Sequence, residues 1–166
     1  MRRAVVETWA ETPPEASASI RLVAACADDF ETLATLRIEA MRESLQPIGR
    51  FDPARSRERL RAGFSAEHTF HIEAEGRRIG FVVIKLEADG LRLDHLYVSP
   101  PAQRRGIGGT VLAQVFARAD AQGLPSSVSA LRGSDANRFY ERHGFVRVGE
   151  GEFDIHYTRA GRPRPA

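Results

Sequence analysis

The sequence predicts a single α/β domain built on a mixed sheet with helices on both faces. Residues 69–98 hold consecutive strand-like segments joined by short turns, which predicts antiparallel neighbours. Residues 91–131 follow a strand–helix–strand order, which predicts a parallel pair joined by a right-handed crossover. The chain has 166 residues, of which 42% are hydrophobic and 28% charged, and this is enough to bury one core.

The first expected elements are a strand and two helices. The apolar run Ile20–Ala25 suits a short strand. Asp28 or Asp29 can cap the helix that follows, whose apolar residues recur at helical spacing. A second helix is expected from Pro53, a favoured first-turn residue, to Phe64.

Three strands should come next. Thr69–Ala74 alternates apolar and polar residues and is followed by a turn at Glu75–Gly76. Ile79–Leu86 is apolar on both faces, which predicts a central strand. A tight hairpin at Ala88–Gly90 leads into a strand over Leu91–Val98, which the following Ser-Pro-Pro ends.

The second half alternates helices and strands. An apolar stripe from Val111 to Ala119 predicts an amphipathic helix that ends at Gly123. The remaining expected elements are a strand at Ser127–Leu131, a short helix at Asp135–His143, and strands near Val146–Val148 and Phe153–Thr158.

Charge and cysteine content exclude several classes of protein. The net charge is only +2, and there is no interleaving of aromatic and basic residues, so we expect no nucleic-acid partner. Cys26 is the one cysteine, which excludes an intrachain disulfide and a cysteine-rich metal site. His68 and His71 should lie on opposite faces of a strand, so we expect no metal.

The expected domain spans residues 20–158. Residues 1–19 contain no apolar core of a signal peptide and are expected to form a disordered leader, and residues 159–166 a disordered tail. No segment is long enough to cross a membrane. These features, with the single cysteine, predict a cytoplasmic protein.

A glycine-rich loop between a strand and a helix is the most informative motif. Gln103–Gly109 reads Gln-Arg-Arg-Gly-Ile-Gly-Gly, and its glycines let the backbone approach an anion where the first turn of a helix offers free N–H groups. Arg104 and Arg105 add positive charge. Thr110-Val111 follows, which fits neither a nucleotide P-loop nor a dinucleotide fingerprint. The loop therefore predicts a polyphosphate ligand, with Gly108 where backbone and phosphate meet.

Three motifs in register resemble the GNAT superfamily of N-acetyltransferases. They are the loop Gln103–Gly109, the preceding segment Leu96–Pro100, and the later segment Asn137–Phe145. The resemblance implies acetyl-CoA as donor, no metal, a possible homodimer, and a mostly antiparallel sheet whose one parallel pair is splayed.

The resemblance also implies roles for individual residues. Pantetheine and the thioester would contact Leu96, Tyr97 and Val98, and one of their N–H groups would stabilise the oxyanion. The pyrophosphate would contact Gln103, Arg104, Arg105, Gly106, Ile107, Gly108 and Gly109. Asn137 would bond the cofactor arm, or instead form a hydrogen bond at the start of its helix. Tyr140 would donate to the cofactor sulfur, or instead serve as a packing aromatic.

The candidate base is Asp94. An amine with a pKa near ~10.4 is protonated at neutral pH and must lose a proton before it attacks. Strand alternation places Asp94 on one face with Leu96 and Val98, and His95 on the other as a structural histidine. Asp94 could act directly, relay the proton through water, or be a structural hydrogen-bond acceptor.

We therefore expect an N-acetyltransferase that moves an acetyl group to a primary amine of a small molecule or peptide, by direct transfer in a ternary complex. A non-catalytic acetyl-CoA sensor is the alternative. The acceptor should be selected by residues 42–64, where Glu43 and Asp52 could bind a cationic amine or be surface acids.

Overall fold

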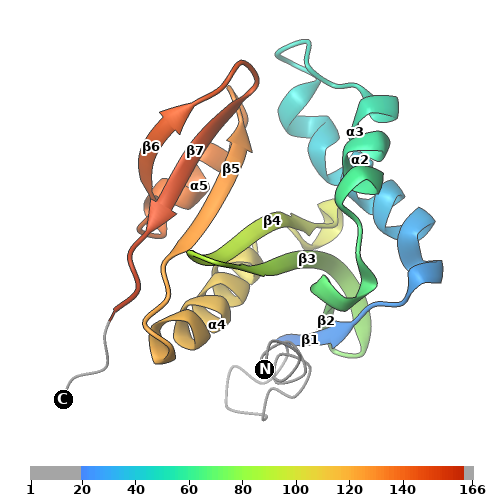
Figure 1. Cartoon of the computed structure of the whole chain (residues 1–166). Helices are drawn as coiled ribbons and strands as arrows, with labels where there is room; N and C mark the ends of the chain where they lie inside the picture. The colour runs from blue at the N-terminus through green and yellow to red at the C-terminus, as the bar shows by residue number, and fades with distance from the viewer. Residues whose placement is uncertain (1–19, 163–166) are drawn as a thin grey trace.

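The computed structural model describes residues 20–162, which form one seven-stranded sheet (Figure 1). The strand order is β1-β2-β3-β4-β5-β7-β6, and only the β4–β5 pair is parallel. The mixed, mostly antiparallel sheet is thereby confirmed. The strands are β1 Ile20–Ala24, β2 Thr69–Ala74, β3 Arg77–Glu87, β4 Gly90–Val98, β5 Ser126–Leu131, β6 Val146–Glu150 and β7 Asp154–Arg159.

Helices cover both faces of the sheet. On one face lie α2 and α3, at the right of Figure 1, and on the other lie α4 and α5. Proline at the first turn and the Asp52 side chain, which accepts the Arg55 N–H, explain where α3 begins. The helices are α2 Phe30–Leu45, α3 Pro53–Gly63, α4 Ile107–Ala121 and α5 Ala136–Arg142, with short 3-10 helices η1 Ala27–Asp29, η2 Ala66–His68 and η3 Pro100–Ala102.

The sheet separates two hydrophobic cores. Val82 and Ile84 of β3 point into the core under α4 and α5. Phe81 and Val83 point into the core under α2 and α3, beside Leu60. Because the middle of β3 is buried on both faces, its sequence from Ile79 to Ile84 contains no charged residue.

The parallel pair separates soon after it forms. Only residues 91–93 of β4 pair with residues 126–128 of β5, although both strands continue beyond that point. Figure 1 shows β5 leaving β4 and carrying β6, β7 and α5 with it. The predicted splay is therefore present, and it leaves one backbone edge of β4 without a strand partner.

A β-bulge at Asp94 corrects the predicted faces of β4. Val83 of β3 pairs with His95, and the next residue, Ile84, pairs with Leu93, so Asp94 is an extra residue in β4. The bulge places Asp94 and His95 on the same side, under α2 and α3, whereas Leu96 packs in the opposite core. Strict alternation fails here because a bulge shifts the side-chain phase by one residue.

The ends of the chain are only partly described. The expected leader, residues 1–19, and residues 163–166 lie outside the described part. Arg159, assigned above to the tail, is the last residue of β7 and pairs with Asp120, and the Arg162 N–H also donates to Asp120. Within residues 20–162, no helix is long and apolar enough to span a membrane.

Candidate functional site: a free strand edge beside an uncapped helix

The glycine-rich loop delivers the chain into the first turn of α4. Arg104 and Gly106 both have left-handed backbones, with φ of 63° and 75°. No side chain within residues 20–162 caps α4, whose first backbone bond is from the Thr110 N–H to the Gly106 carbonyl. The preceding N–H groups of the helix are therefore available to an anion, and the positive end of the helix dipole lies there.

Two glycines of this turn lie close to side chains of α5 and of the residue that follows it. A Cβ on Gly108 would lie 3.0 Å from the Phe139 ring of α5, and a Cβ on Gly109 would lie 2.9 Å from His143 Nε2. A side chain at Gly108 would thus point toward Phe139, and the contact of the Gly108 backbone with phosphate stays a prediction. A Cβ on Gly106 would meet no atom within 4 Å, so that position is open.

The polar side chains of the loop divide into anchors and exposed cations. Gln103 Nε2 donates to the Val98 carbonyl at 2.9 Å, which ties the loop to the end of β4. Arg104 is exposed and pairs with Glu43 of α2 at 3.3 Å. Arg105 is exposed beside the helix start. The cationic side chains remain free to move toward a ligand.

The free edge of β4 presents hydrogen-bonding groups to the splay. The Ser99 N–H bonds the Ile79 carbonyl at 2.8 Å, so it faces β3. Backbone groups alternate along a strand, and the N–H groups of Leu96 and Val98 must therefore face the opposite side, where β5 has separated. Before the bulge the alternation is the reverse: odd-numbered residues face β5, because the Leu91 N–H donates to the Pro125 carbonyl on that side.

Tyr140 lies on α5 in the core beside the splay. It is 6% exposed, and its hydroxyl has no hydrogen-bond partner among the described residues. Burial, together with the nearby Tyr97 phenol, raises the pKa of Tyr140 well above its ordinary value. The residue is therefore a neutral donor whose hydrogen is not committed to the protein.

Asn137 is engaged within the protein. Its Nδ2 donates to the Leu131 and Ser134 carbonyls, each at 2.9 Å, and its Oδ1 accepts from the Tyr157 hydroxyl at 2.8 Å. Both amide hydrogens are thereby used. This arrangement matches the local hydrogen bond considered above and fixes the β5–α5 turn.

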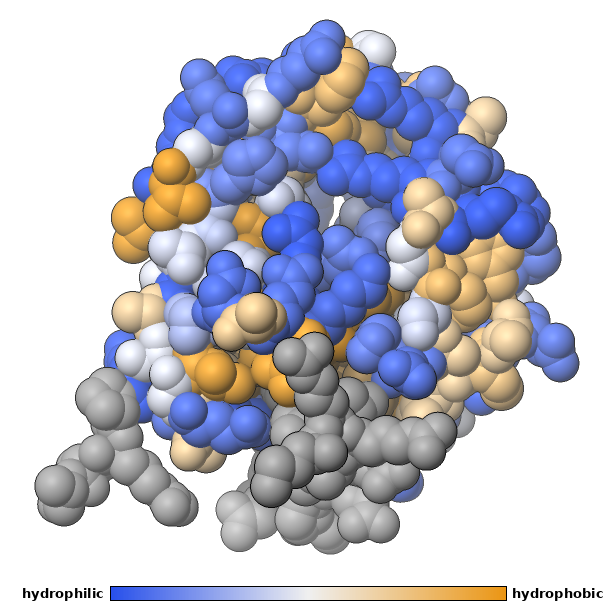
Figure 2. All heavy atoms as spheres, viewed as in Figure 1, coloured by the Kyte–Doolittle hydropathy of each residue, from blue (hydrophilic) through white to orange (hydrophobic). Residues whose placement is uncertain are grey.

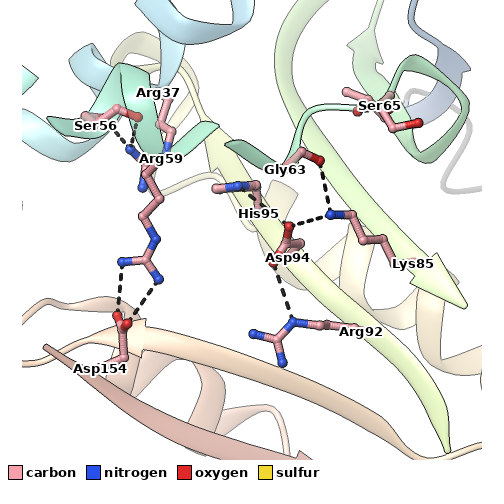
Figure 3. A network of polar contacts seen from close by, with 11 residues as sticks. Arg37, Ser56, Arg59, Gly63, Ser65, Lys85, Arg92, Asp94, His95 and Asp154 are labelled. Carbon is pink, nitrogen blue, oxygen red and sulfur yellow. Dashed lines mark hydrogen bonds and ion pairs between the residues drawn. The ribbon is translucent and has the colours of Figure 1, made fainter. Parts of the chain in front are cut away.

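A polar network surrounds Asp94 under α3 (Figure 3). Lys85 Nζ lies 3.1 Å from Asp94 Oδ2 and also donates to the Gly63 carbonyl at 3.0 Å. Arg92 Nε lies 3.5 Å from Oδ1. Burial disfavours the carboxylate, but His95, Lys85 and Arg92 outweigh it and hold the pKa of Asp94 below its ordinary value.

His95 and Lys85 belong to this network and were missed by strand alternation. His95 Nε2 lies 3.9 Å from Asp94 Oδ2, and its buried Nδ1 has no partner among residues 20–162. Burial and the charge of Arg37 lower the pKa of His95 to about 3. A usable signal was present, because Lys85 is the chain's one lysine and interrupts an apolar central strand.

The described residues hold no group of three or more His, Cys, Asp or Glu side chains suited to a metal ion. The site consists instead of backbone donors, one buried phenol and a charged network, arranged around the opening between β4 and β5.

Comparison with known proteins adds a family and a fold. Residues 65–147 match the acetyltransferase (GNAT) domain family. No curated protein sequence matches the chain.

Several solved structures share the fold. The PaiA N-acetyltransferase of Thermoplasma acidophilum, in complex with coenzyme A, has 20% identity and a TM-score of 0.70, over 86% of this chain and 99% of its own. An acetyltransferase of Thermus thermophilus has 19% identity and a TM-score of 0.67, over 86% and 97%. The ribosomal-protein-S18-alanine N-acetyltransferase of Escherichia coli has 15% identity and a TM-score of 0.63, over 88% and 96%.

The family match spans half of the chain and includes β4, the loop, α4, β5 and α5, which together form the site. With the splayed sheet already described, these findings lead to one conclusion: the chain belongs to the GNAT family of acetyltransferases.

Proposed function

We propose that this protein is an acetyl-CoA-dependent N-acetyltransferase that acts on a primary amine by direct transfer in a ternary complex. The observation that carries the proposal is the free edge of β4 at Leu96 and Val98, which lies between an uncapped α4 and the unpaired hydroxyl of Tyr140.

The residues present fit acetyl-CoA. The first turn of α4, with Arg104 and Arg105, offers backbone donors and positive charge for the pyrophosphate. The Leu96 and Val98 backbone offers amide-pairing groups for pantetheine, whose two amides match a strand edge. When bound, acetyl-CoA supplies an activated acyl group as a thioester.

Two groups of the chain would stabilise charge during transfer. A backbone N–H at the β4 edge would donate to the thioester oxygen as negative charge develops there. Tyr140 would donate its hydrogen bond to the departing sulfur. A free thiol has a pKa near ~8.5, and Tyr140 holds its proton more strongly than that, so the phenol stabilises the thiolate without giving up its proton.

Asp94 would assist removal of the amine proton. Because its pKa is lowered, it is ionised at neutral pH and is a weak base by itself. We therefore assign it the water-mediated route, in which the carboxylate would hold an ordered water that accepts the amine proton and passes it to solvent. Lys85 and Arg92 keep the carboxylate charged throughout.

The test is acetyl transfer measured by thiol release and by mass spectrometry of the product, against a panel of amines and peptides, beside calorimetric titration with acetyl-CoA. Binding together with acceptor-dependent thiol release supports the proposal. Binding without release for every acceptor would favour the sensor alternative, and no binding would overturn both.

A further inference from the structure

A cavity of about 710 Å³ lies between α2, α3, the end of β5 and the loop before β7. The wall contains four arginines, Arg37, Arg50, Arg55 and Arg59, and two carboxylates, Asp52 and Glu152. In Figure 2, the hollow between the β5–β7 arm and the α2–α3 layer is rimmed mainly by hydrophilic residues. The cavity is thus positively charged.

Arg37 is the unusual member of this wall. It is 3% exposed, and its guanidinium donates only to the carbonyl and hydroxyl oxygens of Ser56. Its Nε is buried without a hydrogen-bond acceptor, and no carboxylate within residues 20–162 forms an ion pair with it. A buried charge is ordinarily paired, so this guanidinium lacks the anion that its environment calls for.

The other charges of the wall do not supply that anion. Arg59 is paired with Asp154 at 3.0 Å, and Figure 3 shows the Arg59 guanidinium directed toward that carboxylate and away from Arg37. Asp52 accepts the Arg55 N–H as the cap of α3, and the exposed Glu152 forms no ion pair with Arg37 within residues 20–162. Arg50 and Arg55 form no ion pair with any described carboxylate, and Arg55 lies over the Phe153 ring.

The cavity borders the proposed transfer site. The Arg37 guanidinium lies 5.3 Å from the centre of the Tyr97 ring, and Tyr97 packs against His95. Tyr97 belongs to the β4 segment whose free backbone edge, at Leu96 and Val98, faces the splay. An acceptor held in the cavity would therefore reach the acyl group along β4.

We infer that the acceptor is an amine that also carries a carboxylate, which Arg37 binds with help from Arg50. A planar guanidinium fork matches a carboxylate in geometry and charge, and the cavity volume suits a small amino acid or the first residues of an acidic peptide. That the ligand carries an amine rests on the proposed function, whereas the carboxylate is inferred from Arg37 alone.

The direct test uses glutarate and its neutral diamide, glutaramide, titrated by calorimetry at saturating CoA so that the loop before α4 is also occupied. Wild type should bind glutarate at least about 10-fold more tightly than glutaramide. Arg37→Gln and the exposed Arg50→Gln should each reduce that ratio toward one. Arg57→Gln is the matched control, because Arg57 lies on α3 outside the cavity and pairs with Glu31.

The outcomes separate the two proposals. Equal binding of glutarate and glutaramide by wild type would overturn the carboxylate site, as would a preference that survives both variants in folded protein. Circular dichroism verifies folding, and Arg50→Gln keeps the test valid if Arg37→Gln unfolds. A glutarate preference without acetyl transfer to any amine would instead overturn the proposed function alone.

Acceptor turnover then identifies the source of the carboxylate. The ω-amino acids of increasing length are compared with their amino amides, and peptides with acidic first residues with their Asn and Gln counterparts. Higher kcat/KM for an acid than for its amide, lost in Arg37→Gln, supports the inference and shows which class the cavity accepts. Equal values in both series would contradict it.

Discussion

The two halves of the site differ in what they are made of. The half around the splay consists mainly of backbone, namely the β4 edge at Leu96 and Val98 and the first turn of α4, to which Tyr140 and the exposed arginines of the loop add side-chain donors. The half under α2 and α3 consists of charged side chains, with Arg37 at its centre. Backbone donors can bind a constant ligand whatever side chains they carry, whereas side chains can be exchanged to select a variable one. On the proposed function, the molecule would separate donor binding from acceptor choice.

The largest effect should come from Tyr140→Phe, which keeps the ring and removes the donor. Turnover should fall on the order of 10²-fold, while acetyl-CoA affinity stays the same, because the hydrogen bond strengthens only as the sulfur gains charge. Steady-state kinetics and calorimetry measure the two quantities.

Tyr157→Phe is the matched control, since that hydroxyl is already bonded to Asn137. It should lower the free energy of unfolding by about 1 kcal/mol and leave the chemical step alone. Wild-type turnover in Tyr140→Phe, or equal losses in both variants, would remove the assigned role.

The second test disrupts phosphate binding at the start of α4 without changing the packing around it. Gly106→Asp places a carboxylate at the open, left-handed position before α4, and Gly106→Asn is its neutral twin, which tolerates the same backbone. Acetyl-CoA affinity should fall at least about 10-fold more in the Asp variant than in the Asn variant, because of repulsion with phosphate. Equal affinities in calorimetry would place the phosphates elsewhere.

A third pair of variants separates two roles for Asp94. Asp94→Asn should lower kcat/KM by about 10-fold, most strongly at low pH, where more of the amine is protonated. Lys85→Met removes the main partner of the carboxylate but leaves the carboxylate itself. If the Asp94 carboxylate assists proton removal, Lys85→Met should retain most of the activity. If both variants lose activity equally at every pH, the pair is only structural.

The smallest expected effect concerns His95 and stability. Its pKa is lowered to about 3, so the unfolded chain binds more protons between that pH and the ordinary value near ~6.5. Stability should therefore fall as pH drops through this window, by at most ~1.4 kcal/mol per pH unit from this residue. Urea unfolding gives the free energy of unfolding at several pH values between about pH 7 and about pH 5. This free energy should fall less steeply with decreasing pH in His95→Gln than in wild type. Identical slopes would contradict the burial of a neutral imidazole.

The backbone half could be predicted largely from sequence. Periodicity located the strands and helices because β3 is apolar on both faces and α4 carries a single stripe. The motif Gln103–Gly109 identified the helix start because only certain residues permit a left-handed turn there.

What could not be predicted depends on contacts between distant residues. The bulge at Asp94 has no local signature, and it reverses the faces of His95 and Leu96. Gly108 faces Phe139 because α5 packs against α4, which no spacing within the loop reveals. Arg37 reads as an ordinary helix cation, and only its burial beside Ser56 distinguishes it.

The central claim is that acetyl-CoA occupies the free edge of β4 and the start of α4. Amide hydrogen exchange with and without acetyl-CoA tests it most directly, resolved by residue through NMR. We predict strong new protection at the Leu96 and Val98 amides and at residues 107–109, with little change along β2 or in β6–β7. Binding of acetyl-CoA that leaves the Leu96 and Val98 amides exchanging as before would contradict it.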